Sequence, residues 1–178
     1  MREPRGPGKP RRLRGYDFAS CGEYFVTVVT RDRGEVLGRV EGATVRLFPA
    51  GEAVRDAWTD LPRRFPFLRL DEFVVMPNHI HGILVLVPSD ERALDQPAVR
   101  PGRVHLDIVL QVFKSISTIE VNRVLGRTGV HLWQRGYYEH IVGDDRALER
   151  IRGDISGNPE AWPGDPYNPE AGLPRRQA

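Results

Sequence analysis

The chain has 178 residues, 26 of them basic and 24 acidic, which gives a formal net charge of +2. This length suits one domain with a hydrophobic core of its own. Cys21 is the only cysteine, which excludes an intramolecular disulfide and a cluster of thiolates around structural zinc. No apolar segment has the roughly 18 residues of a membrane span, and none has the form of a signal peptide. We therefore expect a cytoplasmic protein with no membrane partner.

Basic residues are concentrated at the start of the chain. Residues 1–14 hold six basic side chains against one acidic side chain, Glu3. Such an arm is typical of phosphate contact, but it is equally typical of a solvated tail. We predict a basic N-terminal arm over residues 1–15, one domain over residues 16–162, and a flexible tail over residues 163–178, where proline, glycine and charged residues predominate.

The first half of the domain shows the patterns of strands, interrupted by one helix. β-branched and aromatic residues predict strands over 24–30 and 44–48, and apolar residues at helical spacing predict a helix over 49–64. Two further strands, over 68–75 and 79–87, are joined by a tight connection. We therefore expect a β-hairpin after the first helix.

The second half of the domain shows two helical patterns and one strand. Residues 88–103 contain three prolines, which predicts a loop. Apolar residues recur every three or four positions over 104–125, which predicts a long amphipathic helix. A strand over 133–142 and a helix over 144–156 follow. The element order predicts an α+β fold, a ferredoxin-like antiparallel sheet with helices packed on one face.

His79 and His81 are the most informative residues of the chain. On a strand, side chains at positions i and i+2 project from the same face, so both imidazoles can bind one divalent metal ion. A pair of this kind also occurs by chance and in zinc hydrolases of other folds. The interpretation of the pair therefore depends on the surrounding sequence.

Several segments around this pair occur in an order that resembles a known family. They are Gly15-Tyr16-Asp17-Phe18, Tyr24-Phe25-Val26-Thr27, Met76-Pro77-Asn78-His79-Ile80-His81, Phe113-Lys114-Ser115, Trp133-Gln134-Arg135 and Asn158-Pro159. Together they resemble the REP-associated tyrosine transposases, which belong to the IS200-like branch of the HUH single-strand DNA endonucleases. The resemblance extends over residues 11–162.

This resemblance implies an HUH endonuclease fold and a mechanism. Proteins of this family bind single-stranded or hairpin DNA, hold Mg²⁺ or Mn²⁺ with the two histidines, and cleave with a tyrosine that becomes linked to the 5′ phosphate. By this match His79 and His81 are metal ligands, and Asn158 takes the place of the third ligand. The resemblance also implies a monomer, with the swapped dimer of IS200-type relatives as the alternative.

The family's nucleophilic tyrosine is missing from its expected position, where this chain has Asp154. The i to i+4 spacing puts Asp154 and Asn158 on the same helical face. Attack by a carboxylate would leave a labile acyl phosphate, so Asp154 could instead bind the metal or orient a water molecule for hydrolysis. The other alternative is a surface aspartate in a catalytically impaired relic that binds hairpin DNA without cutting it.

Two tyrosines beside the Trp-Gln-Arg motif, Tyr137 and Tyr138, are candidates for a substitute nucleophile. The alternative is that one packs in the core and the other stacks on a base. His140 is also a candidate for orienting a metal ligand. The candidate DNA contacts are Arg11, Arg12, Arg14, Lys114, Arg135 and His140. A metal phosphoesterase of another family would leave the other matching segments unexplained.

Overall fold

The structure, a computed structural model, describes residues 22–87 and 106–171. The predicted loop over 88–103 and the predicted arm, with Arg11, Arg12 and Arg14, therefore lie outside the described residues. No helix within the two described ranges is long and apolar enough to cross a bilayer.

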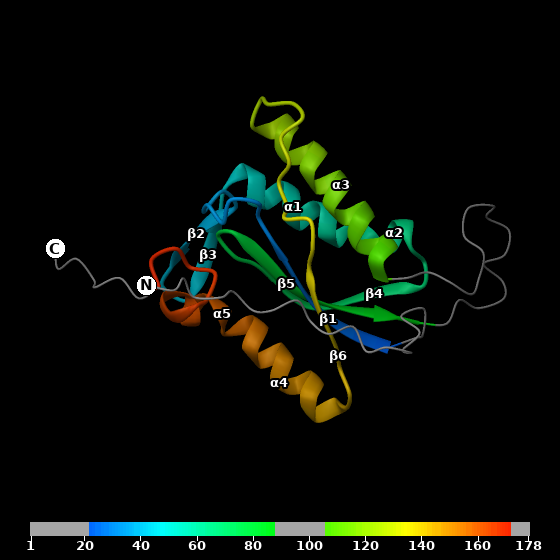
Figure 1. Cartoon of the computed structure of the whole chain (residues 1–178). Helices are drawn as coiled ribbons and strands as arrows, with labels where there is room; N and C mark the ends of the chain where they lie inside the picture. The colour runs from blue at the N-terminus through cyan, green and yellow to red at the C-terminus, as the bar shows by residue number, and fades with distance from the viewer. Residues whose placement is uncertain (1–21, 88–105, 172–178) are drawn as a thin grey trace, which may run out of the picture.

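A four-stranded antiparallel sheet lies at the centre of the fold (Figure 1). In spatial order its strands are β4 (Leu68–Val75), β5 (His79–Leu86), β1 (Gly22–Val29) and β6 (Tyr138–Ile141). The two central strands, β1 and β5, are paired along their full lengths, with Thr27 opposite His81. Their dense β-branched and aromatic residues favour strands, and their burial on both faces requires two covering layers.

Helices α1 (Pro49–Thr59) and α3 (Leu106–Val124) cover one face of the sheet (Figure 1). Trp58 of α1 is fully buried, and its ring centroid lies 5.1 Å from that of Phe113 of α3. The sheet residues that meet these helices alternate along the central strands, as the pleat of a strand requires. They are Tyr24, Val26, Val28, Ile80 and Leu84.

The opposite face of the sheet is covered by α4 (Asp145–Ser156), which packs most closely against β4 (Figure 1). Asp144 caps this helix by accepting a hydrogen bond of 2.7 Å from the Ala147 N–H. Buried Leu148, Ile151 and Ile155 of α4 form a second apolar cluster with Ile83 and Val142. The α+β class and the antiparallel sheet are confirmed, but the predicted placement of all helices on one face is corrected by α4.

Two local features differ from the sequence prediction. The predicted helix over 49–64 is divided at Asp60 into α1 and α2 (Leu61–Arg64), because Pro62 has no N–H to continue the helical hydrogen bonds. A separate hairpin joins β2 (Gly38–Glu41), which was not predicted, to β3 (Thr44–Leu47).

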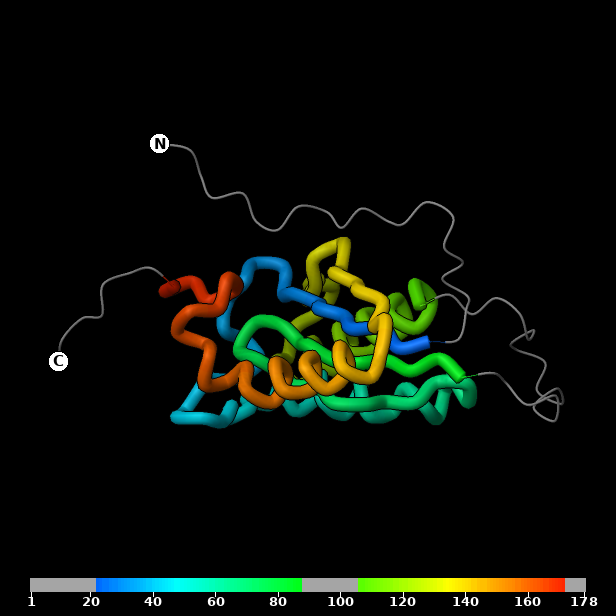
Figure 2. Tube along the Cα trace, turned by 90° about the horizontal axis from the view of Figure 1, so that it is seen from below, coloured from blue at the N-terminus to red at the C-terminus, as the bar shows by residue number. Residues whose placement is uncertain are grey.

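The chain after α4 folds against the sheet. It forms α5 (Asn158–Ala161) and a 3-10 helix (Trp162–Gly164), at the end of the molecule where the β2–β3 hairpin lies (Figures 1 and 2). The sequence predicts no fixed structure from residue 163 onward, yet Asp165 is only 6% exposed. The physical reason is a closed turn, in which Asn168 Nδ2 donates to the Trp162 carbonyl at 2.9 Å.

Gly82 follows His81 and allows Trp58 to approach the strand. A Cβ at this position would lie 2.5 Å from Cζ2 of Trp58 and 3.1 Å from Cβ of Phe73. We expect Gly82→Ala to lower the free energy of unfolding by about 1–3 kcal/mol, as overpacking of a core does. Urea denaturation measures this change.

Gly153 of α4 provides the matched control, because a Cβ there would meet nothing within 4 Å. Gly153→Ala is expected to be neutral or to stabilise the helix by roughly 0.5–1 kcal/mol. Equal stability of Gly82→Ala and the parent protein would contradict this account of the packing.

Candidate metal centre

His79 and His81 lie on the face of β5 that also holds Ile83, close to the connection from β4. Their ring centroids are 4.5 Å apart, and their Nε2 atoms are 3.0 Å apart. His79 is fully buried, whereas His81 is partly buried. The two imidazoles therefore converge, as their i and i+2 spacing on a strand requires.

Each histidine is oriented through its other ring nitrogen. His79 Nδ1 lies 2.9 Å from Oδ1 of Asn78. Because Nδ2 of Asn78 donates to main-chain carbonyls, its Oδ1 accepts, and His79 Nδ1 must be the donor. His79 Nε2 thus presents a lone pair to the centre, as a metal ligand must.

His81 Nδ1 lies 2.8 Å from Oγ1 of Thr27, its neighbour across the β1–β5 pair. With its hydrogen on Nδ1, where Thr27 Oγ1 can accept it, His81 presents the lone pair of Nε2 to the same centre as His79.

Asp165 brings a carboxylate to the two histidines from the C-terminal segment. Its Oδ2 lies 3.9 Å from His79 Nε2. The ligand atoms of His79, His81 and Asp165 all lie within 4.8 Å of one another, and no other group of three His, Cys, Asp or Glu within residues 22–87 and 106–171 does so. Two imidazoles and one carboxylate are a donor set that fits a divalent metal ion.

Asn158, the third ligand expected from the family resemblance, lies beside Asp165. Its side chain hydrogen-bonds to the Asp165 carboxylate. Its Oδ1 is buried and has no hydrogen-bond partner among the residues that the structure describes. Because buried oxygens are almost always satisfied, this orphaned atom fits a metal ion or a metal-bound water. Asp165 was missed because it stands between Pro163 and Pro166 in the predicted tail.

Burial keeps both histidines neutral. It lowers the pKa of His79 well below the ordinary value of 6.5, with a further contribution from His81. It lowers the pKa of His81 to about 4. Burial raises the pKa of the Asp165 carboxyl, which hydrogen bonds from Tyr167 and Asn158 partly offset. A neutral imidazole is the form that binds a metal ion.

These pKa shifts predict that the metal-free protein loses stability in acid. Between pH 6.5, where unfolded histidines titrate, and about pH 4, the unfolded chain binds more protons at His81 than the folded chain does. The free energy of unfolding should therefore fall as the pH decreases through this window. Asp165 acts in the opposite direction, because its raised pKa favours proton binding by the folded state.

Urea denaturation at several pH values in the presence of a chelator measures this dependence. His81→Gln should flatten it, whereas a change at exposed His131 should not. A free energy of unfolding that stays constant from neutral pH to pH 4.5 would contradict the assignment of two buried neutral imidazoles.

Tyr167 closes the centre from the side of the C-terminal segment. Its ring centroid lies 4.8 Å from that of His79 and 6.4 Å from that of His81. Burial raises the pKa of its phenol, whereas the charge of Arg33 lowers it. Tyr167, like Asp165, was predicted to lie in the flexible tail.

Asn78 connects the parts of this centre. Besides orienting His79, its Nδ2 donates to the carbonyls of Arg33 at 2.8 Å and Tyr167 at 2.7 Å. Its position next to the histidine pair was the signal in the sequence, but the two distant carbonyls that it binds were not predictable from spacing.

The three candidate catalytic residues lie in different parts of the structure. Asp154 is exposed on α4 and is not part of the His-His-Asp group. Tyr137 packs against the α1–α3 core and donates a hydrogen bond to Asp107, on the face away from the histidines. Tyr138 lies opposite Thr27 on the histidine face, with its ring centroid 6.2 Å from that of Phe25.

Lys114 supports the Trp-Gln-Arg segment. Its ammonium group donates to the carbonyls of Gln134 at 2.5 Å, Arg135 at 3.0 Å and Gly136 at 3.3 Å. Trp133 Nε1 in turn donates to Ser117 Oγ of α3 at 2.8 Å. These contacts fix the chain between α3 and β6. The side chains of Arg135 and His140 are exposed.

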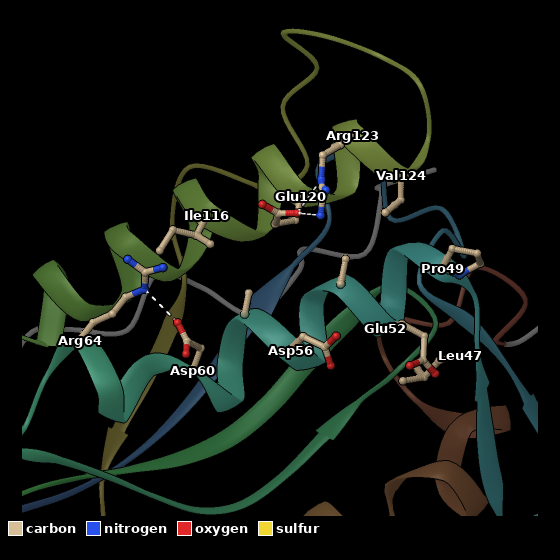
Figure 3. A pocket seen from close by; sticks show the side chains of 12 residues that line it. Leu47, Pro49, Glu52, Asp56, Asp60, Arg64, Ile116, Glu120, Arg123 and Val124 are labelled. Atoms are coloured by element: carbon tan, nitrogen blue, oxygen red, sulfur yellow. Dashed lines mark hydrogen bonds and ion pairs between the residues drawn. The ribbon is translucent and has the colours of Figure 1, made fainter.

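A groove between α1 and α3 lies apart from the metal centre (Figure 3). Both arginines that line it are paired with carboxylates, Arg64 with Asp60 at 3.3 Å and Arg123 with Glu120 at 2.5 Å. Because α1 and α3 cover the face opposite the histidines, this groove cannot deliver a ligand to them. Its paired charges do not favour DNA binding.

Comparison with known proteins gives three informative matches. A Haemophilus influenzae protein described only as uncharacterized is 31% identical over 163 residues, which cover 86% of this chain and 89% of that protein. A second protein of that organism, which carries the name of a REP-associated tyrosine transposase, is 27% identical over 143 residues, covering 80% and 73% of the two chains. No protein-family model matches the chain.

The third match is a solved structure of a REP-associated tyrosine transposase bound to a REP hairpin. It has a TM-score of 0.53 and 20% identity, and the alignment covers 78% of this chain and 67% of that chain. The sheet and its paired histidines thus define a protein with the transposase fold. The chain is similar to the REP-associated tyrosine transposases in sequence and in fold, in agreement with the resemblance of its motifs.

Proposed function

We propose that this protein binds single-stranded hairpin DNA and cleaves it with a divalent metal ion held by His79, His81 and Asp165. The observation that carries the proposal is the 3.0 Å approach of the two Nε2 atoms, with the Asp165 carboxylate 3.9 Å from His79 Nε2. Buried neutral imidazoles oriented by outer hydrogen bonds are typical of metal ligands. The name of the solved relative supports hairpin DNA as the partner.

The donor set favours Mn²⁺ over Mg²⁺, because Mg²⁺ prefers oxygen ligands alone whereas imidazole suits softer ions. When bound, the ion would polarise the scissile phosphate and offset the charge that develops on its oxygens. The residues of the chain fix the geometry, with Asn78 and Thr27 holding the histidine rings and Asn158 holding the Asp165 carboxylate.

The alternative is a relic that binds hairpin DNA without cutting it. Asp154 favours this alternative, because it stands at the family's tyrosine position and lies exposed outside the His-His-Asp group. The retention of a complete donor set favours cleavage. Both alternatives share the hairpin-binding function, so one assay can separate them.

The test is a denaturing gel of labelled single-stranded hairpins of the REP type, incubated with the protein and Mn²⁺. We expect a cut strand that is absent with a chelator and with His81→Ala. Retarded but intact DNA in the matching native gel would indicate the relic. The absence of both binding and cutting would overturn the proposal.

The basic arm provides a separate prediction about DNA affinity. Replacing Arg11, Arg12 and Arg14 together by alanine should weaken hairpin binding and reduce the slope of log affinity against log salt concentration by about 2–3. Filter binding over a range of salt concentrations measures this slope. An unchanged slope would remove the arm from the DNA-binding surface.

A further inference from the structure

Tyr167 is the tyrosine that the structure brings into ring contact with both histidines. Its ring centroid lies 4.8 Å from that of His79, at an interplanar angle of 47°, and 6.4 Å from that of His81. The residue is partly exposed, so part of it is accessible from solvent. A phosphate at the metal centre would therefore lie beside this side chain.

The main chain of Tyr167 is held on both sides. Its N–H donates to Asp165 Oδ1 at 2.7 Å, and its carbonyl accepts from Asn78 Nδ2 at 2.7 Å. The first bond links Tyr167 to a candidate metal ligand, and the second links it to the residue that orients His79. These two bonds fix the backbone of Tyr167 beside the histidines, which contributes to the preorganisation of its side chain.

Arg33 lies next to the same ring. Its guanidinium carbon is 5.7 Å from the Tyr167 ring centroid. The backbone of Arg33 has φ of 54°, the left-handed region that non-glycine residues rarely adopt, and its carbonyl is bound by Asn78. A side chain held in this way at the edge of the centre can neutralise a phosphate oxygen or a phenolate.

The other tyrosines have weaker positions. Tyr24 is fully buried in the α1–α3 core, and Tyr137 is bound to Asp107 on that same side of the sheet. Tyr138 lies on the histidine face, but its ring contact is with Phe25, and within the described residues it has no ring contact with either histidine. Tyr16 lies outside the described residues.

We infer that Tyr167 is the nucleophile of this protein and takes the place of the tyrosine that is missing at position 154. The inference rests on the proposed cleavage function. Tyr167 Oη attacks the phosphorus and gives its proton to water, while the bond from phosphorus to the 3′ oxygen of the preceding nucleotide breaks. That oxygen takes a proton from water, and the 5′ phosphate remains as a tyrosyl phosphodiester. Attack by the freed 3′ hydroxyl on this diester reverses the step.

The test is the formation of a covalent protein–DNA adduct with labelled hairpin and Mn²⁺, measured by denaturing electrophoresis and followed by mass spectrometry of the linked peptide. We expect the parent protein to form the adduct on the peptide that contains Tyr167. Tyr167→Phe should lose the adduct while it keeps hairpin affinity, because the phenyl ring retains the contact with His79. Tyr137→Phe, whose hydroxyl lies on the far side of the sheet, is the matched control and should retain the adduct.

A further variant separates failure of this inference from failure of the proposed function. In Tyr167→Phe combined with Asp154→Tyr, a tyrosine returns to the family position, and adduct formation should reappear. An adduct in Tyr167→Phe alone, or linkage to another residue, would overturn the assignment of Tyr167. Cut strands without an adduct would overturn that assignment and leave metal-dependent cleavage standing. The absence of cutting in all variants would overturn both.

Discussion

Replacing His81 with alanine should weaken Mn²⁺ binding by at least about 100-fold. His81 supplies one of the two Nε2 atoms that face each other at 3.0 Å, so its removal leaves His79 and Asp165 too few to hold the ion. Loss of an outer hydrogen-bond partner of a ligand alone typically costs 10- to 100-fold in affinity, so loss of the ligand itself should cost at least about 100-fold. Titration of free Mn²⁺ by electron paramagnetic resonance measures the affinity.

The matched control is His131→Ala, because this histidine is exposed and belongs to no metal-ligand group within the described ranges. It should bind Mn²⁺ like the parent protein. Circular dichroism should show that both variants are folded, since His81 is only partly buried. Equal Mn²⁺ affinity of His81→Ala and the parent protein would contradict the proposed ligand set.

Replacing Trp58 with alanine should give the largest loss of stability. The indole is fully buried between the sheet and α3, with ring centroids 6.0 Å from Phe73 and 5.1 Å from Phe113. Truncation of a buried tryptophan typically costs about 3–5 kcal/mol. Its Nε1 has no hydrogen-bond partner among the described residues, and removal of this unsatisfied group offsets part of the loss. We therefore expect a decrease of about 3 kcal/mol in the free energy of unfolding.

Chemical denaturation measures this loss, with Ile119→Ala as the control. Ile119 lies on α3 but is 61% exposed, so its truncation should change the free energy of unfolding by no more than about 0.5 kcal/mol. Similar stability of the two variants would contradict the assignment of Trp58 to the principal hydrophobic core, between α1 and the sheet.

The sheet was predictable because its strands carry strong local patterns. β1, β4 and β5 lie within two residues of their predicted bounds. The position of α4 was not predictable in this way, because periodicity shows that Leu148, Ile151 and Ile155 share a face but not which surface they meet. The apolar residues on both faces of β5 were the available signal for a second helical layer.

The candidate site was predictable where its residues are neighbours in sequence. His79 and His81 converge through strand geometry, and Asn158 was placed by family resemblance. Asp165 and Tyr167 were not found, because Asn78 binds the Tyr167 carbonyl across 89 residues of sequence and local composition there predicts only a loose tail. Long-range hydrogen bonds therefore place Asp165 and Tyr167 at the site, although the prolines and the glycine around them predicted a loose tail.

Lys114 has a structural role that its motif did not reveal. Its place on the polar face of a long helix indicated a phosphate contact, which stays a prediction, and in the structure its ammonium group donates to the carbonyls of Gln134, Arg135 and Gly136. These hydrogen bonds show that Lys114 holds the backbone that follows Trp133 in place. The exposed Arg135 remains a candidate for DNA contact.

If the proposed ligand set is correct, His79, His81 and Asp165 hold one metal ion between them. Anomalous diffraction from a crystal of the protein grown with Mn²⁺ can locate that ion. We predict one strong anomalous peak that lies between the two Nε2 atoms and the Asp165 carboxylate, with Asn158 Oδ1 adjacent. A peak at any other site, or none at these residues in a crystal saturated with Mn²⁺, would contradict the account.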